Sequence, residues 1–152
     1  LPPLLPAQAV ATSIAIGPDG AYYVSELKGF PAPTGESRVW RIEPGARHAQ
    51  CGSSPACSVV LDGFTSIIDL TFGPDGTLYV VELDENSWFA FEPLAGPPIG
   101  GSVNACNVAT GNCTQLATGL FMATAATVSK DGTVSVVTNG LIPGAATLST
   151  LP

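Results

Sequence analysis

One seventeen-residue pattern occurs three times in the chain at a constant spacing. Its clearest copy, IIDLTFGPDGTLYVVEL (residues 67–83), has two apolar segments around a Gly-Pro-Asp-Gly turn. The other copies read ATSIAIGPDGAYYVSEL and ATAATVSKDGTVSVVTN. Their turns begin at Gly17, Gly73 and Ser129, a step of 56 residues each time (73 − 17 and 129 − 73). Near-identical units at a fixed period predict a repeat protein.

Each copy has the chemistry of two antiparallel strands joined by a tight turn. Pro fixes φ, Asp bonds its own backbone and Gly takes a positive φ, while Ile, Phe, Tyr and Val favour the flanking strands. Third strands are predicted at 38–43, 88–92 and 146–151, and fourth strands at 58–61 and 114–117. Four short strands per repeat are typical of a β-propeller blade. We therefore predict an all-β propeller of about 56-residue four-stranded blades, with a β-sandwich as the alternative.

The period divides residues 1–152, a single repeat domain, into three blades at 11–62, 63–118 and 119–152. The third blade lacks a fourth strand. Residues 1–10 align with the fourth strands of the other repeats, and their prolines restrict them to an edge position. We expect this segment to be the edge strand that closes the last blade, in its own chain or in a neighbouring one.

Three blades are too few for a ring, since propellers typically have four to eight. We therefore expect completion in trans, either as a six-bladed dimer or as a strand-exchanged filament. A third interpretation is that the sequence is half of a longer polypeptide. The chain begins at Leu1 without Met or a signal peptide, which indicates a processed mature chain or a fragment.

The cysteines form two close pairs, Cys51 with Cys57 and Cys106 with Cys113. Even numbers in equivalent loops predict two local disulfides and a secreted, extracellular protein. Each bond would contribute roughly 2 kcal/mol by restricting the unfolded chain. The alternative is metal binding, but the C-x5-C and C-x6-C spacings do not fit zinc knuckles, and the lone His48 adds little.

Composition narrows the classes of partner. Hydrophobic residues make up 45% of the chain and charged residues only 11%, so a disordered chain is not expected. The net charge of −7 comes with no basic patch, which argues against nucleic-acid binding. No apolar run reaches the length of a transmembrane helix, so no membrane partner is expected.

Two acidic residues are the candidate metal ligands. Glu26 and Glu82 follow the second strands of repeats one and two, where repeat three has Thr138. In a ring they would lie near one mouth of the channel, where carboxylates could hold Ca²⁺ or bring a metal to a lactone. The alternative is a structural role at the strand ends, and no cofactor is otherwise expected. The acidic loop of residues 84–86 is a second calcium candidate, with a solvated turn as the favoured interpretation.

No catalytic residues are predicted. The chain has no G-x-S-x-G, H-E-x-x-H or P-loop pattern, and His48 has no partnering nucleophile motif. Asn112 begins an Asn-Cys-Thr sequon, so it is a candidate glycosylation site and the protein a candidate glycoprotein.

The amino-acid sequence of the first two repeats resembles that of the ScyD/ScyE family. The resemblance is carried by TSIAIGPDGAYYVSELKGFPAPTGESRVWRIEPG (residues 12–45) and GFTSIIDLTFGPDGTLYVVEL (residues 63–83), and the third repeat fits it less well because SKDG replaces GPDG. This family consists of predicted secreted, NHL-like propeller proteins named from the scytonemin pigment cluster of cyanobacteria. The resemblance implies a six-bladed propeller without an assigned activity.

Together these features predict an extracellular structural or interaction protein. Its partner would be itself, through exchanged edge strands, in a closed dimer or a fibre. One alternative is a metal-dependent hydrolase of the lactonase-like propeller type, with Glu26 and Glu82 as ligands. Another is a propeller that binds a glycan or small molecule. An enzyme is the less favoured class.

Overall fold

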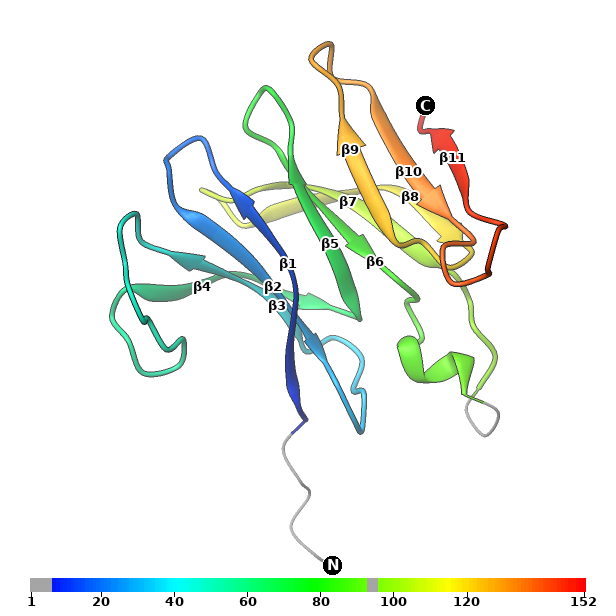
Figure 1. The fold of residues 1–152 in the computed structure, drawn as a ribbon, viewed down its shortest axis with the longest axis horizontal. Helices are drawn as coiled ribbons and strands as arrows, with labels where there is room; N and C mark the ends of the chain where they lie inside the picture. Colours follow the sequence, from blue (N-terminus) through cyan, green and yellow to red (C-terminus); the bar gives the residue numbers. More distant parts are fainter. Residues whose placement is uncertain (1–6, 93–95) are drawn as a thin grey trace, which may run out of the picture.

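The protein folds into three antiparallel β-sheets, seen side by side in Figure 1. The computed structural model describes residues 7–92 and 96–152. The first sheet contains β1 (Ala9–Ile16), β2 (Tyr22–Lys28), β3 (Ser37–Ile42) and β4 (Cys57–Phe64). The second contains β5 (Ile67–Phe72), β6 (Leu78–Glu82), β7 (Gly101–Asn107) and β8 (Asn112–Leu120), and the third contains β9 (Ala125–Val128), β10 (Val134–Thr138) and β11 (Thr147–Thr150). The predicted division into sheets of four, four and three strands is confirmed for the described residues.

The repeated turns have the chemistry that the sequence predicts. In the second turn, the backbone N–H of Gly76 donates to the carbonyl of Gly73 over 3.0 Å, and Gly76 has a φ of 84°. The Asp75 carboxylate accepts the backbone N–H of Thr77 at 3.0 Å. The first and third turns repeat both hydrogen bonds. The shared turn therefore sets the same hairpin in all three sheets.

The predicted third strand of the second sheet is wrong. Instead of a strand at 88–92, the structure has a short 3₁₀ helix, η1 (Trp88–Phe91), whose first turn is capped by the side chain of Ser87. Trp88 donates its indole N–H to the carbonyl of Lys28 over 2.9 Å, which anchors the helix to the first sheet. The third strand is instead β7, which lies between residues 88–92 and the predicted fourth strand at 114–117. Among the described residues, no helix has the length and apolar character needed to cross a membrane.

The prediction that residues 1–10 form an edge strand of the last blade is wrong for Ala9 and Val10. Residues 1–6 lie outside the described residues. Ala9 and Val10 belong to β1, where they pair with Lys28 and Leu27 of the first sheet. These two residues are therefore part of the first sheet of their own chain.

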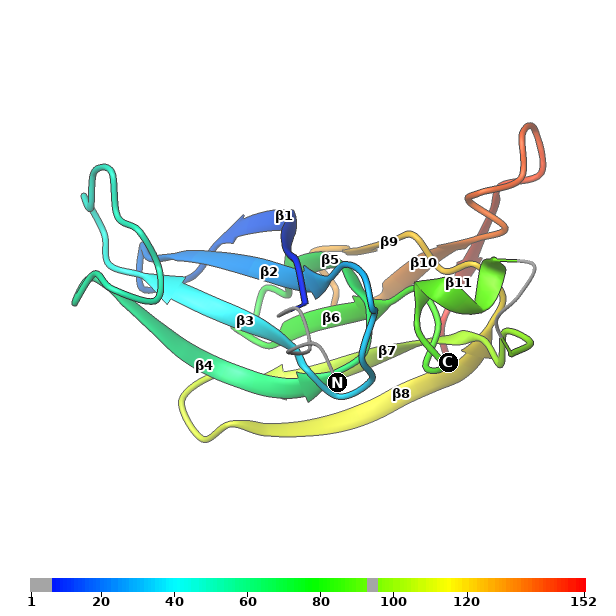
Figure 2. The ribbon, with the colours of Figure 1, turned by 90° about the horizontal axis from the view of Figure 1, so that it is seen from below.

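The first strands of the three sheets, β1, β5 and β9, lie next to one another (Figure 1). Ser13 of β1 donates its hydroxyl to one carboxylate oxygen of Asp69 in β5, over 2.8 Å. The other oxygen of Asp69 accepts the backbone N–H of Ala126 in β9, over 3.0 Å. One carboxylate therefore joins all three sheets. From these neighbouring first strands, the two four-stranded sheets twist away toward β4 and β8 (Figure 2).

The hydrophobic core consists of two layers, one on each face of the second sheet. Leu78 and Val80 of β6 face the first sheet, where they pack with Tyr23 and its neighbours. Tyr79 and Val81, the alternate residues of β6, face the third sheet. Because both faces are covered, every residue of β6 is buried. The first and third sheets each contribute only one face to these layers.

Candidate functional site

Glu26 lies at the end of β2, on the face of the first sheet that points away from the second sheet. Its carboxylate accepts the Trp40 indole N–H at 2.7 Å, forms an ion pair with Lys28, and lies 3.6 Å from the Arg38 guanidinium. Burial raises the pKa of Glu26, but the hydrogen bonds from Lys28 and Trp40 and the nearby cations outweigh it, so the net pKa lies below the ordinary value. Glu26 is therefore an ionised group already balanced by its neighbours.

Glu82 occupies the same repeat position at the end of β6 but is buried between two sheets. It accepts the backbone N–H of Thr65, the hydroxyl of Ser102 at 2.6 Å and the amide of Asn104 at 2.8 Å. Only 7% of its surface is exposed. Its partners come from the connection into β5 and from β7, so this carboxylate joins the start of the second sheet to its third strand.

Neither glutamate belongs to a cluster of metal ligands. Within residues 7–92 and 96–152, no group of three or more His, Cys, Asp or Glu side chains is arranged to hold a metal ion. Glu26 and Glu82 both bond protein donors, as the structural interpretation expects. A calcium or lactonase site at these residues stays a prediction without support from this geometry.

The acidic loop after β6 is built around a buried carboxylate. Asp84 is fully buried and accepts the backbone N–H groups of Asn86 at 2.8 Å and Gly100 at 2.8 Å. Glu85 accepts hydrogen bonds from Gln115 and Thr118 of β8. The expectation of a solvated turn is therefore wrong for Asp84, which instead fixes the approach of the chain to β7.

The outer face of the first sheet carries a group of partly or largely exposed apolar side chains. We call it the first-sheet free face, and it comprises Ile14, Ile16, Tyr22, Val24, Trp40 and Ile42. Cross-strand pairing places these residues together, because directly opposed residues share one face of a sheet. Ile14 is 64% exposed and Ile16 is 66% exposed. Large side chains this open to water are the kind of patch that marks an interaction surface.

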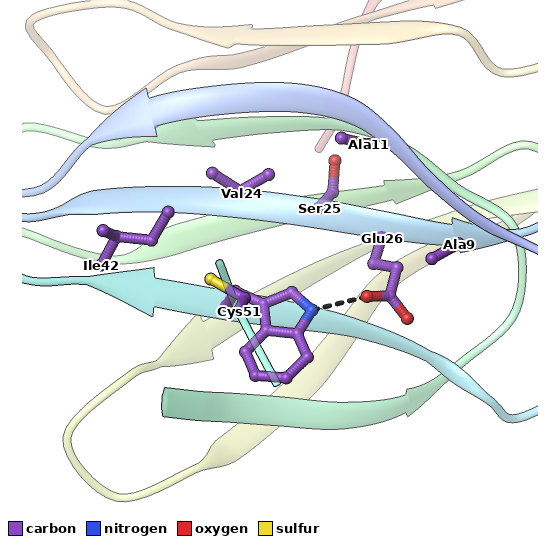
Figure 3. A pocket seen from close by; sticks show the side chains of 8 residues that line it. Ala9, Ala11, Val24, Ser25, Glu26, Ile42 and Cys51 are labelled. Atoms are coloured by element: carbon purple, nitrogen blue, oxygen red, sulfur yellow. Dashed lines mark hydrogen bonds between the residues drawn. The ribbon is translucent and has the colours of Figure 1, made fainter. Parts of the chain in front are cut away.

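A shallow pocket lies within this face (Figure 3). It has a volume of about 200 Å³, and Val24, Glu26, Trp40 and Ile42 contribute to its walls. The Trp40–Glu26 hydrogen bond runs along one side of the pocket. The lining is mostly apolar, and its one carboxylate is already paired, so the pocket favours an apolar side chain over a charged ligand.

The third sheet has an open edge. Its strand order is β11-β10-β9, and among the described residues no strand pairs with the outer side of β11. At the same place in the other sheets, β4 pairs with β3 and β8 pairs with β7. An unpaired strand edge is a template for pairing with another chain. All four residues of β11 are exposed.

Both predicted disulfides are present. Cys51 is bonded to Cys57 and Cys106 to Cys113, and each bond spans the connection between the third and fourth strands of its sheet. The chain has no free cysteine. Disulfides and a β-rich fold are consistent with an extracellular protein. Asn112 and Thr114 of the sequon are exposed, so the site is open to modification, while His48 is exposed in a loop.

Sequence reasoning missed the polar residues that join the sheets. Ser13 and Asp69 lie 56 residues apart, so the repeat itself was the signal that could have found them. Ser102 and Asn104 lie in a segment for which the sequence predicted no strand, and their role depends on Glu82, a long-range partner. The apolar free face also went unnoticed, since the local pattern of β2 resembles that of the buried β6.

The comparisons with known proteins do not assign a family. No protein-family model matches the chain, and no curated protein matches it.

Proposed function

We propose that this chain is an extracellular, NHL-like β-propeller unit of the ScyD/ScyE kind with a structural or interaction role, which self-associates through exchanged edge strands. The product would be a closed dimer of six blades or a fibre. The observation that carries the proposal is the open edge of β11, in a sheet that has one described strand fewer than each of the other two sheets. The hydrogen bonds of an added strand would complete this sheet.

The arrangement of the three sheets supports the propeller interpretation. The first strands lie side by side, and each sheet packs its face on the next one, as blades do around an axis. Two local disulfides support the extracellular assignment. Exposed loops and the Asn112 sequon are compatible with attached sugar.

The test is the native mass and shape of the purified chain, measured by multi-angle light scattering and negative-stain electron microscopy. We expect either round two-chain particles or fibres. Deletion of residues 1–6 should then abolish association. A second variant replaces these residues with a Gly/Ser segment of equal length, which shows whether association needs their side chains or only the length of the segment. Because β1 begins at Ala9, the deletion leaves the described first sheet intact. A stable monomer of the unmodified chain would overturn self-association, and an unchanged mass after deletion would overturn strand exchange.

A further inference from the structure

Two opposite faces of the three-sheet stack lack a neighbouring sheet among the described residues. One is the first-sheet free face defined above. The other is the outer face of the third sheet, here called the third-sheet free face, which comprises Ser135, Val137 and Leu148. Val137 lies opposite Leu148 in the β10–β11 pairing, so the two share a face. Leu148 is 69% exposed, although it is a large apolar residue.

The first-sheet free face is the counterpart of a surface that is buried in the other two sheets. Tyr22 is 37% exposed, whereas Leu78, which lies 56 residues later, is fully buried under the first sheet. Val134, a further 56 residues along, is 8% exposed and packs under the second sheet. Positions 24, 80 and 136 are all valine; Val80 and Val136 are fully buried, while Val24 lies on the free face.

The third-sheet free face is likewise the counterpart of buried surface. Strand pairing gives Val39, Val103 and Leu148 the same place in the third strands of their sheets. Val39 packs toward the second sheet and Val103 toward the third, both with no exposed surface. Leu148 is the same kind of contact residue without a partner sheet. Each free face therefore matches one side of the contact between neighbouring sheets. This contact occurs twice within the chain, between the first and second sheets and between the second and third.

We propose that the third-sheet free face packs on the first-sheet free face of a second copy of this chain, in the geometry that joins the first sheet to the second and the second to the third. This inference rests on the proposed self-association and names the surface that it uses. A second copy is the favoured occupant because its sheets carry the matching half of a contact seen twice within one chain. The third-sheet free face contains no ionisable side chain, and the charged groups beside the first-sheet free face, Glu26, Lys28 and Arg38, lie together at its end.

The contact is head to tail, since it joins two different surfaces. Such heterologous contacts close into a ring where the rotation permits it and otherwise build a filament. The face contact also differs from strand exchange. Side chains on the sheet faces form the face contact, whereas backbone hydrogen bonds at the β11 edge would form the strand exchange. Substitutions on the sheet faces can therefore distinguish the face contact from strand exchange.

The first experiment uses lysine substitutions at exposed apolar positions. Ile14→Lys places a charge on the first-sheet free face, and Leu148→Lys does the same on the third-sheet free face. Ile99→Lys and Leu141→Lys are the matched controls, because Ile99 is 58% exposed and Leu141 is 52% exposed, and both lie in loops rather than in the strands of either face. Burying an unpaired ammonium is costly, so each face variant should associate about tenfold more weakly or worse, while the controls associate like the unmodified chain.

Mixing the two face variants tests the head-to-tail geometry. Ile14→Lys keeps an intact third-sheet face and Leu148→Lys keeps an intact first-sheet face. An equimolar mixture should therefore associate more strongly than either variant alone, because it can form one intact face contact. A mixture that associates no more strongly than the separate variants would overturn the proposal. Circular dichroism and the melting temperature check the fold of each variant, and Ile16→Lys replaces Ile14→Lys if that chain does not fold.

The outcomes separate this inference from the proposed function. A monomeric unmodified chain would overturn both. If the unmodified chain associates and both face variants associate equally well, the face contact is wrong, and the residue 1–6 deletion then decides on strand exchange. If the face variants dissociate while the deletion does not, the face contact stands and strand exchange is wrong.

Discussion

The second strands of the first two sheets have almost the same local pattern but different surroundings. Tyr22–Glu26 reads YYVSE and Leu78–Glu82 reads LYVVE, and both follow the same turn. Every residue of β6 is buried, whereas β2 alternates between buried and more open positions. The local sequence sets which side chains share a face, and the neighbouring sheets determine whether that face is buried. Burial in this protein therefore depends on position in the stack as much as on residue type.

We expect the largest difference in stability between the two strands when a charge replaces the equivalent valines, Val24 and Val80. Val80→Asp places a carboxylate between two sheets without a partner, which should cost roughly 4 kcal/mol or more and unfold much of the population. Val24→Asp should cost about 1 kcal/mol or less, because Val24 lies on the first-sheet free face. Both are measured by urea denaturation in the Leu148→Lys background, which weakens the proposed face contact between copies. Equal losses in the two variants would contradict the comparison.

The sequence predicts the hairpins and disulfides well because both depend on local spacing. The Gly-Pro-Asp-Gly turn and the cysteine pairs are each complete within about ten residues. The prediction of the third strand of the second sheet was wrong because Trp88–Phe91 has the apolar sequence of a strand, whereas β7 has the polar sequence of a loop. Ser102 and Asn104 are polar because they bond Glu82, and Trp88 leaves the sheet because it bonds Lys28. These long-range contacts have no local signature.

The two disulfides provide the second comparison. Cys106 is fully buried in the core layer between the first and second sheets, whereas Cys51 lies in a half-buried loop. The double variant Cys51→Ser with Cys57→Ser should lose about 2 kcal/mol, the loop-closure contribution. Cys106→Ser with Cys113→Ser should lose about 3–4 kcal/mol, because it also leaves a hydroxyl in the core. Thermal unfolding of the two variants checks this order, and a larger loss for the Cys51 variant would be inconsistent with it.

The two glutamates provide the third comparison. Glu82→Gln turns an amide toward the donors of Thr65, Ser102 and Asn104, so it should cost about 1–3 kcal/mol. Glu26→Gln can still accept the Trp40 indole N–H, but it weakens the ion pairs with Lys28 and Arg38 and should cost about 1 kcal/mol, because all three charged groups keep some contact with solvent. Chemical denaturation measures both losses.

Calcium titration of the same variants tests the metal hypothesis. We expect the melting temperature of the unmodified chain to stay constant on adding calcium, since both carboxylates already accept hydrogen bonds from the protein. A rise in the unmodified chain that disappears in both glutamine variants would instead support a metal site at Glu26 and Glu82.

The smallest expected effect concerns the turn of the third sheet and its response to acid. Hydrogen bonds from Ser129 and Thr133 lower the pKa of Asp131 to about 2, below its ordinary value of 3.8. A carboxyl with a depressed pKa in the folded state stabilises the protein above its unfolded pKa, and this contribution is lost as the pH falls through the folded value. The gap in melting temperature between the unmodified chain and Asp131→Asn should therefore be constant from pH 7 to pH 5 and close between about pH 4 and pH 2.

Asp75→Asn, in the turn of the second sheet, is the matched control for this titration. The backbone and side chain of Thr77 lower the pKa of Asp75, so its gap should close in the same direction. The Asp75 carboxylate has no counterpart of the Ser129 hydroxyl, because Gly73 occupies that position. Its gap should therefore be smaller and close at a higher pH than that of Asp131. If both gaps stay unchanged down to pH 2, the turn carboxylates do not stabilise their hairpins through charge, and the shared turn acts through its backbone geometry alone.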